Sequence, residues 1–463
     1  MNDTHTEQSG RIATGLLPLN DFRSAVASAE ITTVMLAVPD MMGRLKGKRL
    51  DAETFMERLH SGVEACAYIL ATDVDMSPVP GYELTGWETG YGDLSVIPDL
   101  HSIRRLPYLP GTALIHADVA HASGELVEFA PRRMLQVQLE RLSGLGLDVR
   151  VGLESEFVLY QGVPQQAGPA RYRRLRPVSP HNLDYSLDHP PALSDFFQHL
   201  EEAMWGASTQ VESVKMEGAP GQVEVTFPYG EALRACDSYT VYRHAVRNIA
   251  ARRGMRPTFM AAPKTGVGSG LHLHLSLWSE GRNAFAAHPG EPELPEPLHQ
   301  AVAGLISGLP HMAPLYAPTP NSYKRYVPHS FAPTRYTWGY DNRSCAVRIT
   351  GHGERQHAEV RLPGADANPY LALAAALAAI VHGITDEPEL LPPCTGDAYQ
   401  ADSALPVPRD LADAVSDFDG SKTALAAFGD SVVRHYTRAA QVEIDEHRRR
   451  VTDVELQRGF DRA

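Results

Sequence analysis

The chain has 463 residues, of which 43% are hydrophobic and 21% charged, and its formal net charge is −14. A chain of this length is too long to fold around one ordinary hydrophobic core, so we expect two domains, one of them large. The negative charge argues against nucleic acid as a partner. The N-terminus has no apolar signal core, and the longest apolar run, residues 369–383, is shorter than the roughly 20 residues that span a bilayer. We therefore expect a cytoplasmic protein without a membrane partner.

The N-terminal quarter of the sequence predicts a small mixed domain. Residues 1–12 are expected to be disordered, and the domain then extends to about residue 118. A helical pattern lies near Leu19–Ala27. The strands predicted after it lie at 31–37, within 39–49, at 92–98 and at 113–119.

The rest of the sequence predicts a larger domain of mixed strands and helices. Pro131 stands at a first helical position and opens a helix that ends near Gly144. Strands and helices then alternate to about residue 383, where a buried, Ala-rich helix ends. Proline-rich loops are expected at 161–192, 280–298 and 384–410, and helices with charged faces at 411–460. The four cysteines form no Cys-x-x-Cys pair, so neither a zinc site nor a disulfide is implied: Cys66, Cys236, Cys345 and Cys394.

The segment Gly268–Trp278 carries the clearest functional pattern. Four leucines alternate with His272, His274 and Ser276, which is the period of two of a strand. One face of this strand is apolar and suits a core. The other face presents two imidazoles and a hydroxyl side by side, where a solvated face would more often carry Lys, Glu or Thr.

The same alternation recurs in three other segments. Glu154 and Glu156 share one face of residues 149–159, and Gln222 and Glu224 share one face of residues 221–227. Glu359 and Arg361 lie opposite Val360 and Leu362. Four strands are therefore predicted to present acid, imidazole or guanidinium groups opposite an aliphatic face.

Together these polar positions predict a site for divalent cations. Five carboxylates converging without cations would repel one another and raise each other's pKa values. Two Mg²⁺ or Mn²⁺ ions would relieve this, and oxygen-rich ligation with one imidazole suits these ions better than Zn²⁺. Two such ions suit phosphoryl transfer from ATP, and an arginine set would clamp carboxylates and phosphates. The carboxylates and imidazole are Glu154, Glu156, Glu217, Glu224, Glu359 and His272; the arginines are Arg325, Arg343, Arg348 and Arg361.

Each element has a plainer interpretation when it is taken alone. Glu154 and Glu156 could form a solvated strand face, and the two histidines could be satisfied core residues. Arg343 or Arg348 could be a structural ion pair, and residues 321–325 could be a polar turn. The functional interpretation depends on finding all of these elements together in one chain and in this order.

The segments that carry these residues resemble the glutamine synthetase family of the type I lineage, and the resemblance extends over nearly the whole chain. The resemblance implies an α+β fold, with a β-grasp N-terminal domain over 12–118 and a catalytic domain of curved antiparallel strands and helices over 119–463. It also implies a homo-oligomer, a dodecamer of two stacked hexameric rings, with active sites between neighbouring subunits. The blocks that carry it are Gly152–Phe157, Glu217–Glu224, Thr258–Met260, Gly268–His274, Pro318–Arg325, Asn342–Arg343 and Glu359–Tyr370.

The resemblance also implies a role for each matching residue. One metal would bind Glu156, Glu217 and Glu224, and the other Glu154, His272 and Glu359. ATP would contact His274, Ser276 and Arg348. Glutamate would contact Arg325, Arg361 and the backbone at Gly268, and Arg343 would stabilise the transferring phosphoryl group. The implied reaction phosphorylates glutamate with ATP to γ-glutamyl phosphate, which an amine then attacks.

Three departures from the family pattern concern the nucleophile and glutamate. Members that use ammonia carry an Asp in a Phe-Asp-Gly-Ser-Ser stretch and a Glu on the flap after Asn-Ser-Tyr-Lys-Arg. Here residues 61–70 lack that motif, and Phe331 stands where the flap Glu should be. Val267 also replaces an Asn that contacts glutamate in many members. Phe331 cannot accept a proton, although its ring face could lie against an ammonium group. Glu64 could supply the missing acid or be an ordinary loop carboxylate.

We therefore hypothesise a glutamate–amine ligase whose nucleophile is an organic amine. The pattern resembles the branch of the family that γ-glutamylates polyamines or ethanolamine. An ammonia-using glutamine synthetase is one alternative, and a non-catalytic glutamate or nucleotide sensor on the same scaffold is another. The filled metal positions argue against the sensor. A guanidino kinase has a similar catalytic core, but the glutamate-side arginines and the N-terminal domain argue against it.

Overall fold

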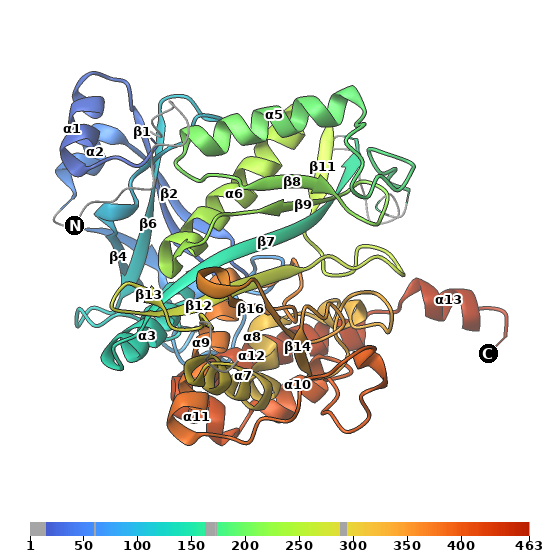
Figure 1. The fold of residues 1–463 in the computed structure, drawn as a ribbon. Helices are drawn as coiled ribbons and strands as arrows, with labels where there is room; N and C mark the ends of the chain where they lie inside the picture. Colours follow the sequence, from blue (N-terminus) through green and yellow to red (C-terminus); the bar gives the residue numbers. More distant parts are fainter. Residues whose placement is uncertain (1–14, 60–61, 163–171, 173, 288–293, 463) are drawn as a thin grey trace.

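The computed structural model describes residues 15–59, 62–162, 172, 174–287 and 294–462. The disorder predicted for residues 1–12 lies outside these ranges. The described chain forms two sheets, with helices packed on and around them (Figure 1).

The first sheet contains six strands in the order β2-β1-β6-β4-β3, with β5 paired to β6. Strands β1 and β6 run parallel, and the other pairs are antiparallel. Helix α1 meets α2 through an edge-to-face contact of Phe22 with Phe55, whose ring centroids are 6.0 Å apart. The predicted helix and strands of this region are confirmed to within a few residues. The bounds are α1 Leu19–Ala27, β1 Thr33–Pro39, β2 Leu45–Asp51, α2 Ala52–Glu57, β3 Val63–Cys66, β4 Asp93–Pro98, β5 Arg104–Arg105 and β6 Thr112–Ala120.

The second sheet contains ten strands, and the long strand β7 lies at its centre (Figure 1). Its main order is β14-β15-β16-β12-β7-β9-β8, while β10 and β11 also pair with β7 and β13 pairs with β12. The bounds are β7 Asp148–Gln161, β8 Ser213–Met216, β9 Gln222–Thr226, β10 Gly230–Glu231, β11 Met255–Thr258, β12 Leu271–Ser279, β13 Arg282–Asn283, β14 Trp338–Tyr340, β15 Val347–Thr350 and β16 His357–Val360. The division into domains at residue 118 stays a prediction, although it falls at the end of β6, between the two sheets.

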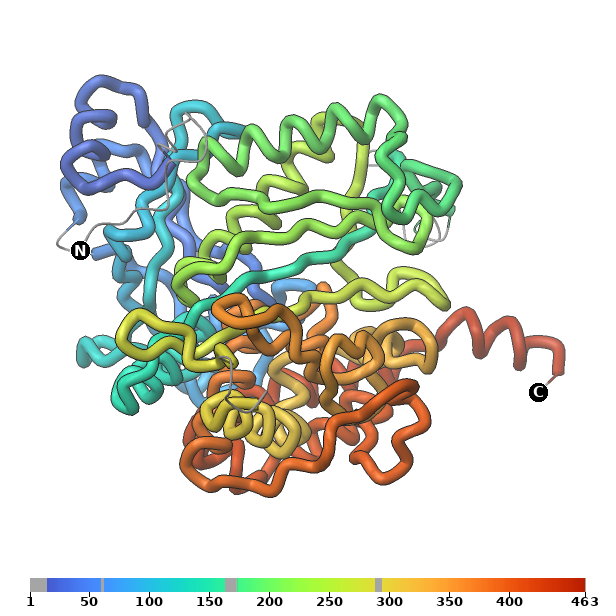
Figure 2. Tube along the Cα trace, in the orientation of Figure 1, coloured from blue at the N-terminus to red at the C-terminus, as the bar shows by residue number. Residues whose placement is uncertain are grey.

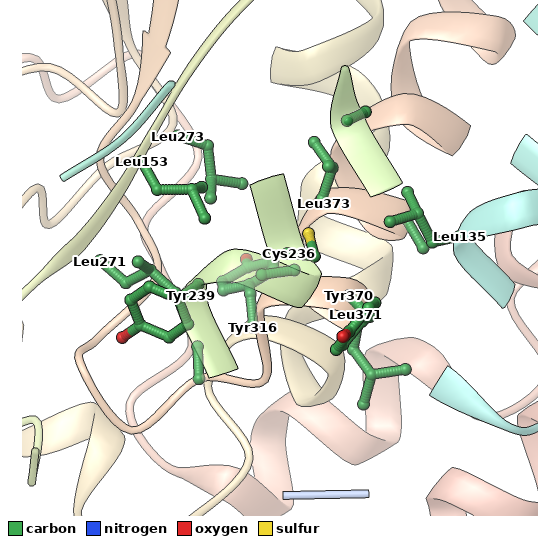
Figure 3. Packing of buried hydrophobic residues seen from close by; sticks show 14 of the residues in the cluster. Leu135, Leu153, Cys236, Tyr239, Leu271, Leu273, Tyr316, Tyr370, Leu371 and Leu373 are labelled. Carbon is green, nitrogen blue, oxygen red and sulfur yellow. The ribbon is translucent and has the colours of Figure 1, made fainter. Parts of the chain in front are cut away.

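The predicted aliphatic faces do pack into the core. Leu153 of β7 and Leu271 and Leu273 of β12 lie in a buried cluster with side chains from α6 and α9 (Figure 3). Helix α9 has the length and composition of a membrane span, but 78% of its apolar window is buried inside the protein, as predicted for a core helix. The larger helices are α3 Pro131–Gly144, α5 Pro191–Gly206, α6 Ala232–Arg252, α7 Glu296–Gly308, α9 Pro369–Asp386 and α12 Asp430–Arg449; the shorter ones are α8 Ala313–Tyr316, α10 Leu411–Phe418, α11 Lys422–Phe428 and α13 Asp453–Gly459.

Helices α7 and α9 approach each other through glycines. A Cβ atom added to Gly304 would lie 2.1 Å from the Ala379 carbonyl oxygen, and one added to Gly383 would lie 2.0 Å from the Gln300 carbonyl oxygen. Real Cβ atoms do not come this close to backbone, so the separation of the two helices depends on both glycines.

Helix α12 packs against the N-terminal part of the chain. His435 of α12 is buried, its Nε2 donates to the Leu70 carbonyl oxygen at 2.9 Å, and its ring stacks on Phe129 at 4.1 Å between centroids. Helix α13 instead projects away from the body of the molecule (Figure 2). It has no buried residue, and Phe460 just beyond it is 81% exposed.

Candidate active site

The register of four adjacent strands brings the predicted polar positions together. Strand β12 pairs with β7 so that His272 lies opposite Glu154. On its other edge β12 pairs with β16, which places Glu359 opposite His274. Strand β9 pairs with β7 so that Glu224 lies opposite Glu156. The period-two pattern thus produces one continuous polar surface on the strands β16-β12-β7-β9.

The histidines and acids of this surface are in direct contact. His272 Nδ1 is 2.5 Å from Glu154 Oε1 and 3.5 Å from Glu359 Oε1, while its Nε2 is 3.9 Å from Glu156 Oε1. His274 Nε2 is 3.4 Å from Glu154 Oε2. Two trios have ligand atoms within 4.8 Å of one another: Glu154, Glu156 and His272, and Glu154, His274 and Glu359. His274, expected beside ATP, therefore also stands among the potential metal ligands.

The pKa values of these acids diverge because their neighbours differ. Burial disfavours the charged form of Glu359, but Arg361 and the two histidines outweigh it and lower the pKa of Glu359 to about 2. Burial raises the pKa of Glu224 to about 9, and the nearby charges of Glu154 and Glu217 add to the rise. The raised pKa of Glu224 means that its ionised form is disfavoured. A bound cation would stabilise the ionised form, so the set of donor atoms fits a hard divalent ion.

A cation that the sequence analysis missed, Lys215, lies beside two of the acids predicted to hold the first metal, Glu217 and Glu224. The Lys215 ammonium pairs with Glu217 and lies 3.4 Å from Glu224 Oε2, and it also lies 4.6 Å from the centre of the Tyr185 ring. The Gly218 N–H donates to Glu217 Oε2 at 2.9 Å. Lys215 thus balances part of the charge on these acids. Lys215 precedes Glu217 by two positions, and residues two apart in a strand share a face. This spacing was the pattern in the sequence that could have indicated the contact.

A glutamine positions Glu156. The Gln222 side-chain amide donates to Glu156 Oε2 at 2.9 Å and to the Gly268 carbonyl oxygen at 2.8 Å. The sequence placed Gln222 on the polar face but suggested no role for it. The structure shows that it connects a potential metal ligand to the backbone at the predicted glutamate position.

Three of the predicted arginines surround the same surface. Arg325 is buried, donates to the Arg361 and Leu362 carbonyl oxygens at 3.2 and 3.1 Å, and places Nη2 3.2 Å from His272 Nε2. Arg361 pairs with Glu359. Arg348 donates to Glu359 Oε2 at 3.0 Å and to Asp341 Oδ1 at 2.7 Å.

A cleft of about 830 Å³ opens beside the polar surface. It is lined by all three residues expected to contact ATP, namely His274, Ser276 and Arg348. Its other lining residues include two that the sequence analysis missed, Tyr229 and Trp278, whose rings are stacked with centroids 6.3 Å apart. Aromatic rings beside basic groups suit a ligand with both a flat ring and phosphates.

Arg343 lies apart from these groups, in a shallower cavity of about 520 Å³ that Phe331 also lines. Phe331 is 67% exposed and has a positive φ of 60°, which is unusual for a residue other than glycine. Its carbonyl oxygen accepts a hydrogen bond from Arg361 Nη2 at 3.3 Å. Glu64 is exposed on β3, at the edge of the first sheet, and does not line this cavity.

Comparisons with known proteins agree with this geometry. The family profile of the glutamine synthetase catalytic domain matches residues 128–459. A γ-glutamylethanolamide synthetase of Streptomyces coelicolor is 45% identical over 448 residues, which cover 96% of each chain. A glutamate–isopropylamine ligase of a Pseudomonas species is 32% identical and covers 96% of this chain and 98% of its own. Among solved structures, GmaS in complex with ADP superposes with a TM-score of 0.81 at 27% identity, covering 95% of this chain and 99% of that one.

The chain therefore belongs to the glutamine synthetase family and has its fold. It is a ligase that forms carbon–nitrogen bonds. Family membership implies the use of ATP and a divalent metal, and the described acids and histidines include groups that could hold such an ion.

Proposed function

We propose that the protein is an ATP-dependent glutamate–amine ligase whose nucleophile is an organic amine such as ethanolamine or a polyamine. The observation that carries the proposal is the combination of a full set of acids and imidazoles at the polar surface with Phe331 at the flap position. The first supports glutamate phosphorylation, and the second lacks the carboxylate that would deprotonate ammonium. The two amine-ligase relatives support the same assignment.

We assign two Mg²⁺ or Mn²⁺ ions to each active site. Glu156, Glu217 and Glu224 would hold one, and Glu154, His272 and Glu359 the other. Bound there, the ions would neutralise phosphate charge. The ligand set fits because it offers mainly carboxylate oxygens in strands that fix their spacing. His274, Ser276 and Arg348 would hold ATP in the 830 Å³ cleft.

Glutamate would bind next to this cleft. Arg325 and Arg361 would hold its carboxylates, and the backbone at Gly268 would accept from its ammonium group. Arg343 would then stabilise charge on the transferring phosphoryl group. Phosphorylation converts the γ-carboxylate oxygen, a very poor leaving group, into phosphate, so that an amine can form the amide.

We further propose that the protein works in the cytoplasm as a homo-oligomer, a dodecamer of two hexameric rings. Arg343 and Phe331 line an open cavity that a neighbouring subunit could complete. The exposed apolar side chains around α13 suit a contact with another copy. The four cysteines are free, as expected in a reducing compartment.

The test is phosphate release from ATP with glutamate, Mg²⁺ and one amine at a time. We expect turnover with at least one of ethanolamine, putrescine or a short alkylamine, and little with ammonia. Turnover with ammonia alone would instead identify a glutamine synthetase. Glutamate and nucleotide binding without any turnover would identify a regulator, and phosphorylation of arginine or creatine without glutamate a guanidino kinase.

A further inference from the structure

A second cavity, of about 900 Å³, lies behind the turn that carries Arg325. One of its walls is formed by helix α6, Phe259 and the turn η5 (Ser322–Arg325) with the residues before it. The cavity is also lined by the end of α12 and by residues between 73 and 80. Lys324 lines this cavity, whereas the next residue, Arg325, contacts His272 at the catalytic surface.

The α6 wall carries two positive charges without a paired acid. Arg243 is only 6% exposed, and its Nε and Nη1 atoms are buried without a hydrogen-bond partner among the described residues. Its guanidinium carbon lies over two ring faces, 5.0 Å from the centre of Phe259 and 6.0 Å from that of Tyr239. Arg247, one turn further along, lies 5.5 Å from the same Phe259 ring.

This arrangement is costly without a ligand. Like charges four positions apart on a helix repel each other. A buried donor without a hydrogen-bond partner destabilises the folded state. A ring face offsets part of this cost, but it does not neutralise the charge.

Five acids line the cavity: Asp73, Asp75, Asp366, Glu443 and Glu446. The Ser77 N–H donates to Asp73 Oδ1 at 2.8 Å, the Val74 N–H donates to Glu443 Oε1 at 3.3 Å, and Asp75 lies 4.0 Å from Arg450 Nη2. Glu446 on the α12 wall pairs with Arg449 and Arg450. Asp366 accepts hydrogen bonds from Thr319 and Ser322, and its other oxygen is buried without a partner among the described residues. Burial raises the pKa of Asp366, and the nearby charge of Arg243 opposes this rise. Among the described residues, Arg243, Arg247 and Lys324 thus remain as three positive groups along one part of the cavity lining, with no ion pair to an acid.

We propose that this cavity binds a small organic dianion, a dicarboxylate or a phosphate monoester, between Arg243, Arg247 and Lys324. Two planar guanidinium groups and one ammonium group match the paired oxygens of such a ligand. The cavity volume is in the range of ordinary small-molecule sites.

The bound dianion would act on the catalytic surface through the turn. Asp366 ties Thr319 and Ser322 together, and the Asn321 side chain accepts from the Ala262 N–H at 3.0 Å and donates to the Ala262 carbonyl oxygen at 2.9 Å. A ligand that binds Lys324 thus acts on a segment that is anchored just before Arg325, at residues 319–322. We expect the KM for glutamate to change; this second readout rests on the proposed function, whereas binding itself does not.

Calorimetry on the full-length protein with Mg²⁺, saturating glutamate and a non-hydrolysable ATP analogue tests the proposal. Glutarate and glycerol phosphate are the two probes, and filling the catalytic surface first keeps both probes away from it. Titration of glutamate and the ATP analogue alone shows separately whether the proposed function fails. We expect one probe to bind with a dissociation constant in the millimolar range or tighter, and its identity distinguishes a carboxylate from a phosphate ligand.

The variants Arg247→Met and Arg243→Met should each weaken that binding roughly tenfold or more, because each removes a charge-assisted contact. Arg450→Met removes a positive charge at the end of α12 that Glu446 already pairs with, and it should leave binding unchanged. Arg247→Met is the safer variant because Arg247 is exposed, whereas Arg243 is packed in the core. Equal binding by the wild type and Arg247→Met, or no binding of either probe to the wild type, would overturn the proposal.

Discussion

At the scale of single residues, Phe331 separates this protein from family members that use ammonia. Its side chain is exposed, its backbone is in the left-handed region, and it shares a cavity with Arg343. We predict that Phe331→Glu will raise turnover with ammonia, because a general base is gained. It should also lower kcat/KM for the preferred amine by roughly tenfold, because the ring face that we expect to lie against the amine is lost. Phe331→Gln is the matched control, because it has similar size but cannot accept the proton. Equal ammonia use by both variants would contradict this role for the carboxylate.

Gln222 provides a second prediction at this scale. Its amide holds Glu156 and the Gly268 carbonyl together, so Gln222→Ala should weaken binding of Mn²⁺ by about 10–100-fold, as is typical when a residue that orients a metal ligand is removed. Electron paramagnetic resonance of free Mn²⁺ measures this without turnover. Gln198→Ala, on the exposed face of α5, is the control. Unchanged Mn²⁺ affinity in Gln222→Ala would show that Glu156 needs no such support.

The sequence predicted the members of the candidate site but not all of their neighbours. Alternation placed Glu154, His272 and Glu359 each on the polar face of its own strand, and the strand pairing puts their side chains in contact. It could not show that Lys215 pairs with Glu217 and Glu224, because a lysine on a strand is most often solvated. It also could not separate Arg343 from the other arginines, since their distances depend on loops rather than on strand register.

At the scale of elements, the long periodic segments were predictable and the short ones were not. The strands around Glu154 and His272 alternate over many residues and were correctly identified. Strands β5, β10 and β13 have two residues each, and two residues carry no period. The parallel pairing of β1 with β6 also depends on the chain between them and leaves no local pattern.

Helix α12 gives rise to a prediction about pH. Burial lowers the pKa of His435 to about 3 in the folded protein, compared with 6.5 for an ordinary histidine. As the pH falls, His435 therefore takes up a proton in the unfolded chain before it does so in the folded protein. The stability contributed by neutral His435 is fully present above pH 6.5. It is lost as the pH falls towards 3, by about 1.4 kcal/mol for each pH unit.

We expect urea unfolding at several pH values to show this loss in the wild type and a smaller one in His435→Gln, which can still donate to the Leu70 carbonyl but does not titrate. The difference in unfolding free energy between the two proteins should shrink between pH 7 and pH 4.5. A difference that stays constant over this range would show that His435 does not control the acid sensitivity. His199→Gln, at an exposed position on α5, serves as the control.

At the scale of the whole molecule, contacts within one chain do not explain how α13 is stabilised. A helix of seven residues is marginal in water by itself, and the side chains exposed around it include Val451, Val454, Leu456 and Phe460. If the proposed oligomer depends on this segment, Phe460→Asp should lower the mass found by analytical ultracentrifugation. Gln457→Asp adds the same charge at a nearby exposed position and should not. A full-size assembly of Phe460→Asp would exclude this segment as an essential contact.

The crossing of α7 and α9 has a consequence for how far this protein can vary. Because Gly304 and Gly383 have no room for even one methyl group, an alanine at either position would force the two backbones apart. Helix α9 packs in the same apolar cluster as Leu153 and Leu271, whose strands bear the acids and imidazoles on their reverse side. Adding one methyl group at either glycine would therefore shift α9 and, through the buried cluster, change the distances between the ligand atoms on the other face of the sheet. Two glycines that take no part in the chemistry would thus constrain catalysis.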